Sequence, residues 1–150
     1  MIALACDHGA VEMKKEIKKL LDELKEEYID FGTDSTQSVD YPLYAEKAAR
    51  SVLSGESKLG ILLCGTGIGM SLAANKIAGI RCALCSDPYS AAMSRRHNNA
   101  NMLAMGARVI GPELAKCIVR EFLSNPFEGG RHERRVDMIM KLEQGKTLNE

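Results

Sequence analysis

The segment that decides the fold is Leu59-Gly-Ile-Leu-Leu-Cys-Gly-Thr-Gly-Ile-Gly69. Its first six residues, 59–64, form an uninterrupted apolar run, which is typical of a strand covered on both faces in a parallel sheet. The three alternating glycines that follow indicate a tight turn from this strand into a helix. The stretch therefore predicts the centre of an α/β protein.

Working outward, short apolar runs alternate with longer amphipathic patterns along the whole chain. The predicted strands are 2–6, 28–31, 59–64, 80–85 and a fifth within 101–110, and the predicted helices are 10–27, 41–55, 70–77, 87–97, 112–123 and 131–144. This alternation predicts a three-layer α/β sandwich around a five-stranded parallel sheet. With 150 residues and no repeat or linker, we expect residues 1–150 to form a single domain.

Composition excludes several classes of protein. The chain has 20 acidic and 20 basic residues and is 45% hydrophobic, which favours a folded domain over disorder and argues against nucleic-acid binding. No apolar stretch approaches the roughly 20 residues of a membrane span, so we expect a cytoplasmic protein with no membrane partner. The five cysteines are an odd number set among apolar neighbours, which argues against a disulfide framework. Cys82 and Cys85 have metal-site spacing, but on a strand they point to opposite faces and are interpreted as small core residues.

Polar residues gather where two of the predicted strands end. In open parallel sheets, ligands bind outside the carboxyl ends of the strands, and Asp7-His8 and Cys64-Gly-Thr-Gly-Ile-Gly69 lie at such ends. The second segment is not a dinucleotide fingerprint, because Met70 stands where G-x-G-x-x-G needs its last glycine. Its free N–H groups suit an anion, and a helix N-terminus favours the thiolate form of a neighbouring cysteine. Cys64 is thus a candidate base or nucleophile, the alternative being an inert buried cysteine.

Two further groups have both a functional and a plain structural interpretation. His97 ends a predicted helix, where a cation is favoured by the helix dipole whatever its chemistry. Arg131 and Arg135 share one face of the last predicted helix, which suits a bidentate phosphate site but also an ordinary solvated face. The segment has no interleaved aromatic residues, so it does not indicate nucleic-acid binding.

Taken together, the motifs resemble the type B ribose-5-phosphate isomerases, in the wider family that includes galactose-6-phosphate isomerase subunits. The matching pieces are Cys6-Asp-His-Gly9, Val39-Asp-Tyr-Pro42, Cys64-Gly-Thr-Gly-Ile-Gly69, Ala73-Ala-Asn-Lys76, Gly79-Ile-Arg81, His97-Asn98, Asn101, Arg108-Val-Ile-Gly111 and Gly129-Gly-Arg-His132 with Arg135. The resemblance implies a Rossmann-like α/β/α fold with a five-stranded parallel sheet and neither metal nor cofactor. It also implies a homodimer or dimer of dimers with active sites at the subunit interface.

The implied reaction interconverts D-ribose 5-phosphate and D-ribulose 5-phosphate through an enediol. By resemblance, Cys64 moves the proton between C2 and C1, His97 opens the furanose ring, and Asp7 handles hydroxyl protons. Thr66 and neighbouring N–H groups would stabilise the enediolate. The expected substrate contacts are Asp7, His8, Tyr41, Gly65, Thr66, Gly67, Ile68, Gly69 and Asn98, and the expected phosphate ligands are Arg108, Arg131 and Arg135.

Other functions remain open at the level of the sequence. The substrate could be a hexose 6-phosphate such as allose or galactose 6-phosphate, because one extra carbon changes binding by only about 1–3 kcal/mol. A non-catalytic phosphate-binding α/β module is the alternative outside enzymes. A phosphate-accepting receiver domain is disfavoured, since it needs an aspartate where this chain has Cys64.

Overall fold

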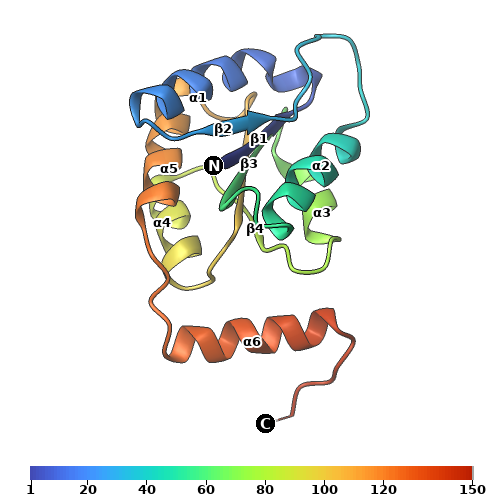
Figure 1. Cartoon of the computed structure of the whole chain (residues 1–150), viewed down its shortest axis with the longest axis vertical. Coiled ribbons are helices and arrows are strands. Elements are labelled where there is room, and N and C mark those ends of the chain that lie inside the picture. The colour runs from blue at the N-terminus through green and yellow to red at the C-terminus, as the bar shows by residue number, and fades with distance from the viewer. Residues whose placement is uncertain (150) are drawn as a thin grey trace.

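The protein is described by a computed structural model over residues 1–149, and its centre is a fully parallel sheet (Figure 1). The strands are β1 (Ile2–Cys6), β2 (Tyr28–Asp30), β3 (Leu59–Cys64), β4 (Cys82–Leu84) and β5 (Met102–Gly106). Their order across the sheet is β2-β1-β3-β5-β4, with every neighbouring pair parallel. Every residue of β3 is buried, as the apolar run predicted, because β1 and β5 flank it and helices cover both its faces.

Helices cover both faces of this sheet. They are α1 (Val11–Glu23), α2 (Tyr41–Leu53), α3 (Ile68–Asn75), α4 (Pro88–Arg96), α5 (Pro112–Ser124) and α6 (Arg131–Glu143), with a short 3-10 turn, η1, at His8–Ala10. One core cluster joins α1, α4 and α5 to one face of the sheet, and a second joins α2 and α3 to the other. The predicted three-layer α/β/α sandwich is therefore confirmed. Cys85 belongs to the first cluster and Cys82 packs on the second, as expected for opposite faces of a strand.

Some element boundaries differ from the expectation for identifiable local reasons. The α1 helix stops at Glu23 instead of reaching residue 27, and Lys25, two residues later, has a φ of 56°, outside the helical region. The β4 strand is shorter than 80–85 because the N–H of Ile80 donates to the carbonyl of Ile77 at 3.1 Å and the N–H of Arg81 donates to the side chain of Asn101 at 2.8 Å, so neither N–H takes part in strand pairing. At the start of α4, Asp87 accepts a hydrogen bond from the N–H of Ser90 at 2.7 Å, which confirms the predicted N-cap.

The last helix, α6, projects from the body of the molecule, below the sheet as seen in Figure 1. Among its residues His132 and Val136 are buried, while Ile139 and Leu142 remain about half exposed. Its far end is tied back to the body by the carboxylate of Glu143, which accepts the N–H of Gly79 at 3.1 and 3.2 Å. Among residues 1–149, no helix has both the length and the apolar content that crossing a bilayer requires.

Candidate active site

Three neighbouring strands bring the turn after β3 together with the residues that follow β1 and β5. The backbone N–H of Asp7 donates to the carbonyl of Leu63 at 3.1 Å. On the other side, Ala107 donates to the carbonyl of Cys64 at 2.8 Å and Arg108 to that of Gly65 at 2.9 Å. The polar turns at this carboxyl edge are therefore fixed to one another by backbone hydrogen bonds, where a parallel sheet binds its ligands.

The sulfur of Cys64 is oriented by the glycine turn. The N–H of Gly67 donates to Cys64 Sγ at 3.0 Å, and α3 begins at the next residue. Gly67 has a φ of 79°, and a Cβ there would lie 2.8 Å from the backbone carbonyl carbon of Met105, so this position requires glycine. The sulfur thus lies next to the N-terminus of a helix with a main-chain donor pointing at it.

Three of the other cysteines are in environments that suppress thiolate formation. Burial raises the pKa of Cys6 and that of Cys85 to about 11, and it raises the pKa of Cys82 to about 12. Cys117 is exposed on α5, and all five cysteines are free. Cys64 is buried as well, but it combines a place at the carboxyl ends of the strands with a backbone donor, which makes it the candidate for a reactive thiol.

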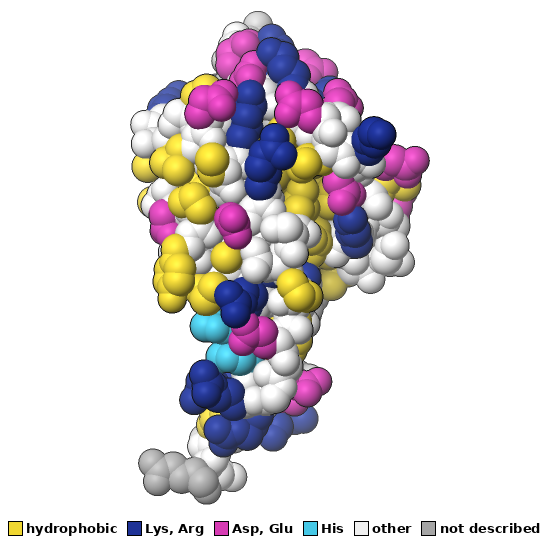
Figure 2. Space-filling view, turned by 90° about the vertical axis from the view of Figure 1, so that its left-hand side faces the viewer, with side chains coloured by type: hydrophobic (Ala, Val, Ile, Leu, Met, Phe, Trp, Pro, Cys, Tyr) yellow, Lys and Arg dark blue, Asp and Glu magenta, His cyan; other side chains and the backbone are white. Residues whose placement is uncertain are grey.

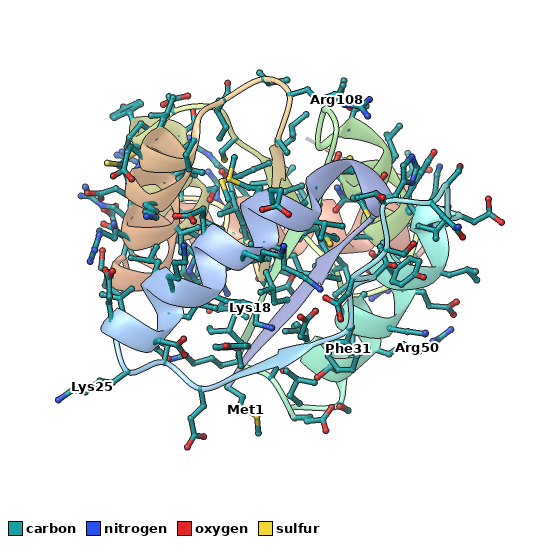
Figure 3. The ribbon with its side chains drawn as sticks, turned by 90° about the horizontal axis from the view of Figure 1, so that it is seen from above. Met1, Lys18, Lys25, Phe31, Arg50 and Arg108 are labelled. Atoms are coloured by element: carbon teal, nitrogen blue, oxygen red, sulfur yellow. The ribbon has the colours of Figure 1, made fainter. Side chains whose placement is uncertain are left out.

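A guanidinium group lies over the same turns. A Cβ on Gly9 would be 3.5 Å from Nη2 of Arg108, and a Cβ on Gly65 would be 3.3 Å from its Nη1. Arg108 therefore packs across two positions without side chains, and it projects beside α3 in Figure 3. Below it, the buried carboxylate of Asp7 accepts the N–H of Gly9 at 2.8 Å. An anion at this edge would meet a positive charge and a fixed carboxylate next to the sulfur.

His8, Tyr41 and Thr66 complete this group. Nδ1 of His8 accepts the N–H of Val39 at 3.2 Å, which leaves its Nε2 as the donor nitrogen of the neutral ring. The Tyr41 ring packs on Gly69, where a Cβ would lie 2.7 Å from Cζ. The hydroxyl of Thr66 accepts the N–H of Ile68 at 3.2 Å at the start of α3.

Cavities flank the turn on two sides. One of about 340 Å³ is lined by His8 and Gly9 together with the start of α5. Another of about 420 Å³ is lined by Tyr41, Gly69 and neighbouring residues of α2 and α3. Both lie beside residues that the sequence selected as substrate contacts, and neither of these two cavities is lined by Cys64, Thr66 or Arg108.

The remaining expected site residues lie at the other end of the strands, near their amino ends. The α4 helix begins after β4 and runs back along the sheet, so His97 and Asn98 lie near the amino ends of the strands. The α5 helix runs back likewise, and Arg131 and Arg135 follow it on α6. Figure 2 shows histidine side chains at the constriction between the body and α6, above a group of Lys and Arg side chains. Within one chain, the structure does not bring this second group to Cys64, and it separates Arg108 from the other two arginines.

The second group includes a carboxylate that sequence reasoning did not single out, Glu128. The rings of His97 and His132 stack with centroids 4.1 Å apart and planes 7° from parallel. Oε2 of Glu128 lies 3.9 Å from Nε2 of His97 and 3.5 Å from Nε2 of His132. Glu128 is the one acidic residue in the segment Phe127-Glu-Gly-Gly-Arg131. It lies far from His97 along the chain, so the sequence gives no sign that the two side chains are in contact.

These three side chains are also of the kinds that bind metals, with ligand atoms within 4.8 Å of one another. A tetrahedral metal needs imidazole lone pairs that converge on one point about 2.0–2.1 Å away. Parallel stacked rings direct their in-plane lone pairs along parallel planes instead. The arrangement therefore fits proton and charge handling better than metal coordination.

The comparison with known proteins agrees with this geometry. Residues 2–139 match the Ribose/Galactose Isomerase family. The chain belongs to this family. It is 53% identical to "Ribose-5-phosphate isomerase B" of Escherichia coli, over 97% of this chain and 98% of that protein. It is 45% identical to "D-erythrulose-4-phosphate isomerase" of Pectobacterium atrosepticum, over 92% of this chain and 91% of that protein.

A solved structure of the family gives the same fold with a ligand. It is ribose-5-phosphate isomerase B from Mycoplasma genitalium with bound ribulose-5-phosphate, which has a TM-score of 0.90 and 39% identity, covering 95% of each chain. The resemblance inferred from the motifs is confirmed. The protein is accordingly an aldose–ketose isomerase of sugar phosphates, and the alternative of a non-catalytic module is wrong.

Proposed function

We propose that the protein interconverts D-ribose 5-phosphate and D-ribulose 5-phosphate in the cytoplasm, as a homodimer or a dimer of dimers. The observation that carries this proposal is the sulfur of Cys64, held by the Gly67 amide beside the guanidinium of Arg108. A base, a main-chain donor set and a phosphate ligand at one edge are the parts that proton transfer on a sugar phosphate needs. The five free cysteines fit a reducing compartment.

The reaction begins with ring opening. His97 gives a proton to the ring oxygen of the furanose while the bond between that oxygen and C1 breaks. The C1 hydroxyl releases its proton to water, from which His97 is reprotonated, so that no proton is gained or lost. The open-chain aldehyde then lies against the turn after β3. Asn98, which directly follows His97 in the chain, contacts the sugar there. His97 acts here as a general acid, a step that typically contributes about 10²–10⁴-fold in rate.

Proton transfer follows in two balanced steps. The Cys64 thiolate takes the proton from C2, and the electron pair moves to the C1 carbonyl oxygen, which becomes an enediolate oxygen held by Thr66 and the N–H groups of 65–69. Asp7 carries the C2 hydroxyl proton to that oxygen. The thiol then returns its proton to C1 as C2 becomes the carbonyl of the ketose, so no proton is gained or lost overall.

In this proposal the two groups of residues come from different copies of the chain. Residues of β3 alone span roughly 20 Å at about 3.3 Å each, more than a pentose phosphate can bridge between the two edges of the sheet. A two-fold partner would bring its His97, Asn98, Arg131 and Arg135 to the Cys64 edge of the first copy. The phosphate would then be held by Arg108 of one subunit and by the partner's two arginines, while His8 and Tyr41 border the sugar.

Exposed apolar side chains support such an assembly. Several large ones lie on α3, on β4 and the segment after it, and on α6, and they include Ile68, Leu72, Leu84, Tyr89, Ile139 and Leu142. Leaving these in water costs free energy that burial against a second copy would recover. One of these side chains, Ile68, is the first residue of α3 and therefore lies next to the turn that carries Cys64.

The proposal is tested by an assay of aldose-to-ketose conversion with the purified protein and no added metal, on ribose 5-phosphate and on allose 6-phosphate and galactose 6-phosphate. We expect the highest kcat/KM on the pentose. A higher kcat/KM on a hexose phosphate would reassign the substrate, and no turnover on any of the three would overturn the proposal.

A further inference from the structure

Glu128 is held to the end of α4 by both its backbone and its side chain. Its N–H donates to the carbonyl of Arg96 at 3.0 Å, and its Oε1 accepts Nε of Arg96 at 2.5 Å. The hydrogen bond from Arg96 lowers the pKa of the Glu128 carboxyl, so it stays ionised at neutral pH. A turn residue between α5 and α6 is thereby fixed beside His97, which directly follows Arg96.

The second oxygen of this carboxylate faces the two stacked imidazoles. Oε2 lies 3.5 Å from Nε2 of His132 and 3.9 Å from Nε2 of His97. His132 is nearly buried, whereas the side chain of His97 is 38% exposed. The Nε2 edge of His97 is therefore turned toward the protein, and stacking on His132 limits its rotation. The other ring nitrogen, Nδ1, remains for contact with a ligand.

Cations surround this carboxylate. Burial lowers the pKa of His132, and positive charge on His97, Arg131 and Arg135 lowers it further, while Glu128 opposes the shift. Arg96 adds a further positive charge on the other oxygen of the carboxylate. Without a negative group here, these arginines would repel a protonated imidazole from the position next to α6.

We infer that Glu128 is the positioning residue for ring opening, which holds the imidazole of His97 with one edge toward the protein so that its free nitrogen meets the sugar ring oxygen. The inference rests on the proposed function, and it assigns Glu128 a role in the first step only. Proton transfer between C2 and C1 does not pass through it. Loss of the carboxylate should therefore slow the reaction of a cyclic sugar and spare that of a sugar with no ring to open.

A pair of substrates separates these steps. Ribose 5-phosphate is mainly a furanose, whereas D-erythrose 4-phosphate has no free hydroxyl from which to close a five-membered ring. In Glu128→Gln, which keeps the size of the side chain, we expect kcat/KM on ribose 5-phosphate to fall roughly tenfold to a hundredfold. This loss is part of the ~10²–10⁴-fold by which a general acid raises the rate. On erythrose 4-phosphate we expect a change below about threefold. Glu133→Gln, on an exposed residue of α6, is the matched control and should leave both values unchanged.

An NMR titration of the histidine side chains gives a second measurement that needs no turnover. The chain has three histidines, so the ring signals are readily assigned. In Glu128→Gln the titration midpoint of His132 should move to lower pH, because a group that raises its pKa is gone and Arg96, Arg131, Arg135 and His97 remain. The midpoint of His8, at the other edge of the sheet, should not move.

The outcomes separate this inference from the proposed function. Equal losses on both substrates, or losses equal to those of Glu133→Gln, would overturn the positioning role while leaving the isomerase intact. If the wild-type protein does not turn over the tetrose, the NMR titration decides, and an unchanged His132 midpoint overturns the inference. Absence of ribose 5-phosphate turnover in the wild-type protein would instead overturn the proposed function.

Discussion

The backbone N–H of Gly67 points at the sulfur of Cys64 across 3.0 Å, so the turn that ends β3 also orients the proposed base. The same turn supplies the N–H groups that would hold the enediolate, and its helix supplies the positive end of a dipole. One short segment of chain thus carries both the proposed base and the N–H donors that would stabilise the enediolate.

Replacing Cys64 should separate chemistry from binding. In Cys64→Ala we expect kcat/KM on ribose 5-phosphate to fall by roughly 10²–10⁴-fold, the usual contribution of a general base. The dissociation constant for ribose 5-phosphate, measured by calorimetry, should stay within about threefold, because the arginines remain. Cys117→Ala, at an exposed position on α5, is the control and should behave as wild type. Parallel losses of binding and turnover would remove Cys64 from the role of base.

The left-handed backbone at Gly67 gives a prediction on stability and activity together. Gly67→Ala would place a Cβ 2.6 Å from Leu84 and 2.8 Å from Met105, so we expect the free energy of unfolding to fall by about 2–4 kcal/mol and activity to be lost. Gly55 has nearly the same φ, 80° against 79°, with nothing within 4 Å of an added Cβ. Gly55→Ala should therefore cost only about 1 kcal/mol. Chemical denaturation measures the free energy of unfolding of each variant, and the isomerase assay measures its activity. Equal losses of stability in Gly67→Ala and Gly55→Ala would contradict the packing argument.

The fold was predictable because its determinants are local in the sequence. The apolar run of β3 and the glycines after it specify a buried parallel strand and its turn, and Asp87-Pro88 specifies the start of α4. The boundaries that differed depend on tertiary contacts. The start of β4, for example, depends on Asn101, whose side chain accepts the N–H of Arg81 although it lies 20 residues further along the chain.

The sequence could name candidate site residues, but it could not give their arrangement. The order β2-β1-β3-β5-β4 and the direction of α4 decide that His97 and Cys64 lie at opposite edges, and neither follows from any local pattern. The contact of Glu128 with His97 likewise depends on how the turn before α6 folds back onto Arg96. The family resemblance supplied the candidate residues, and the structure showed that within one chain they form two separate groups.

A buried lysine holds the start of the loop that contacts His8 through Val39 and ends at Tyr41. Lys14 is 1% exposed, and its Nζ bonds Asp30 at 2.9 Å, Asp34 at 2.7 Å and the carbonyl of Thr33 at 2.9 Å. In Figure 3, Lys18 points from α1 toward β2, where it shares Asp30 with Lys14 at 3.1 Å. We expect Lys14→Met to lower the free energy of unfolding by about 2–4 kcal/mol, because it leaves the partly buried carboxylate of Asp30 and the carbonyl of Thr33 without this cation.

The control for this change lies on the same helix. Lys15 pairs with Glu12 at the surface, and Lys15→Met should cost less than about 0.5 kcal/mol. The effect of Lys14 should also depend on pH. Burial opposes its charge, but the hydrogen bonds to Asp34 and Asp30 outweigh burial and raise the pKa of Lys14. Its contribution is therefore fully present below the unfolded pKa, about 10.4, and lost as pH rises through the higher folded value.

On the acid side the sign is reversed. The hydrogen bond from Lys14 lowers the pKa of Asp34, so the pair contributes stability above the unfolded pKa of about 3.9 and loses it as pH falls through the lower folded value. Denaturation of wild type and Lys14→Met between pH 3 and 11 measures the difference in unfolding free energy. A difference that stays constant over this range would show that packing, and not charge, accounts for the loss.

Mixed dimers test whether the two edges of the sheet work across subunits. Cys64→Ala damages one edge and His97→Asn the other, so each homodimer should be nearly inactive. After refolding a mixture of the two, half of the dimers combine both variants, and each of these has one site with an intact Cys64 edge and an intact His97 edge. We expect recovery to about a quarter of wild-type activity, the limit that two-fold symmetry sets for random pairing.

A second mixture controls for nonspecific rescue. Cys64→Ala and Asp7→Asn both damage the same edge, so a mixed dimer of these two has no complete site and should regain nothing. If His97 instead served the Cys64 of its own chain, the first mixture would also stay inactive, because every chain would carry a defect. Recovery in the first mixture and not in the second therefore requires a site shared between two copies, since no rearrangement within one chain restores both edges.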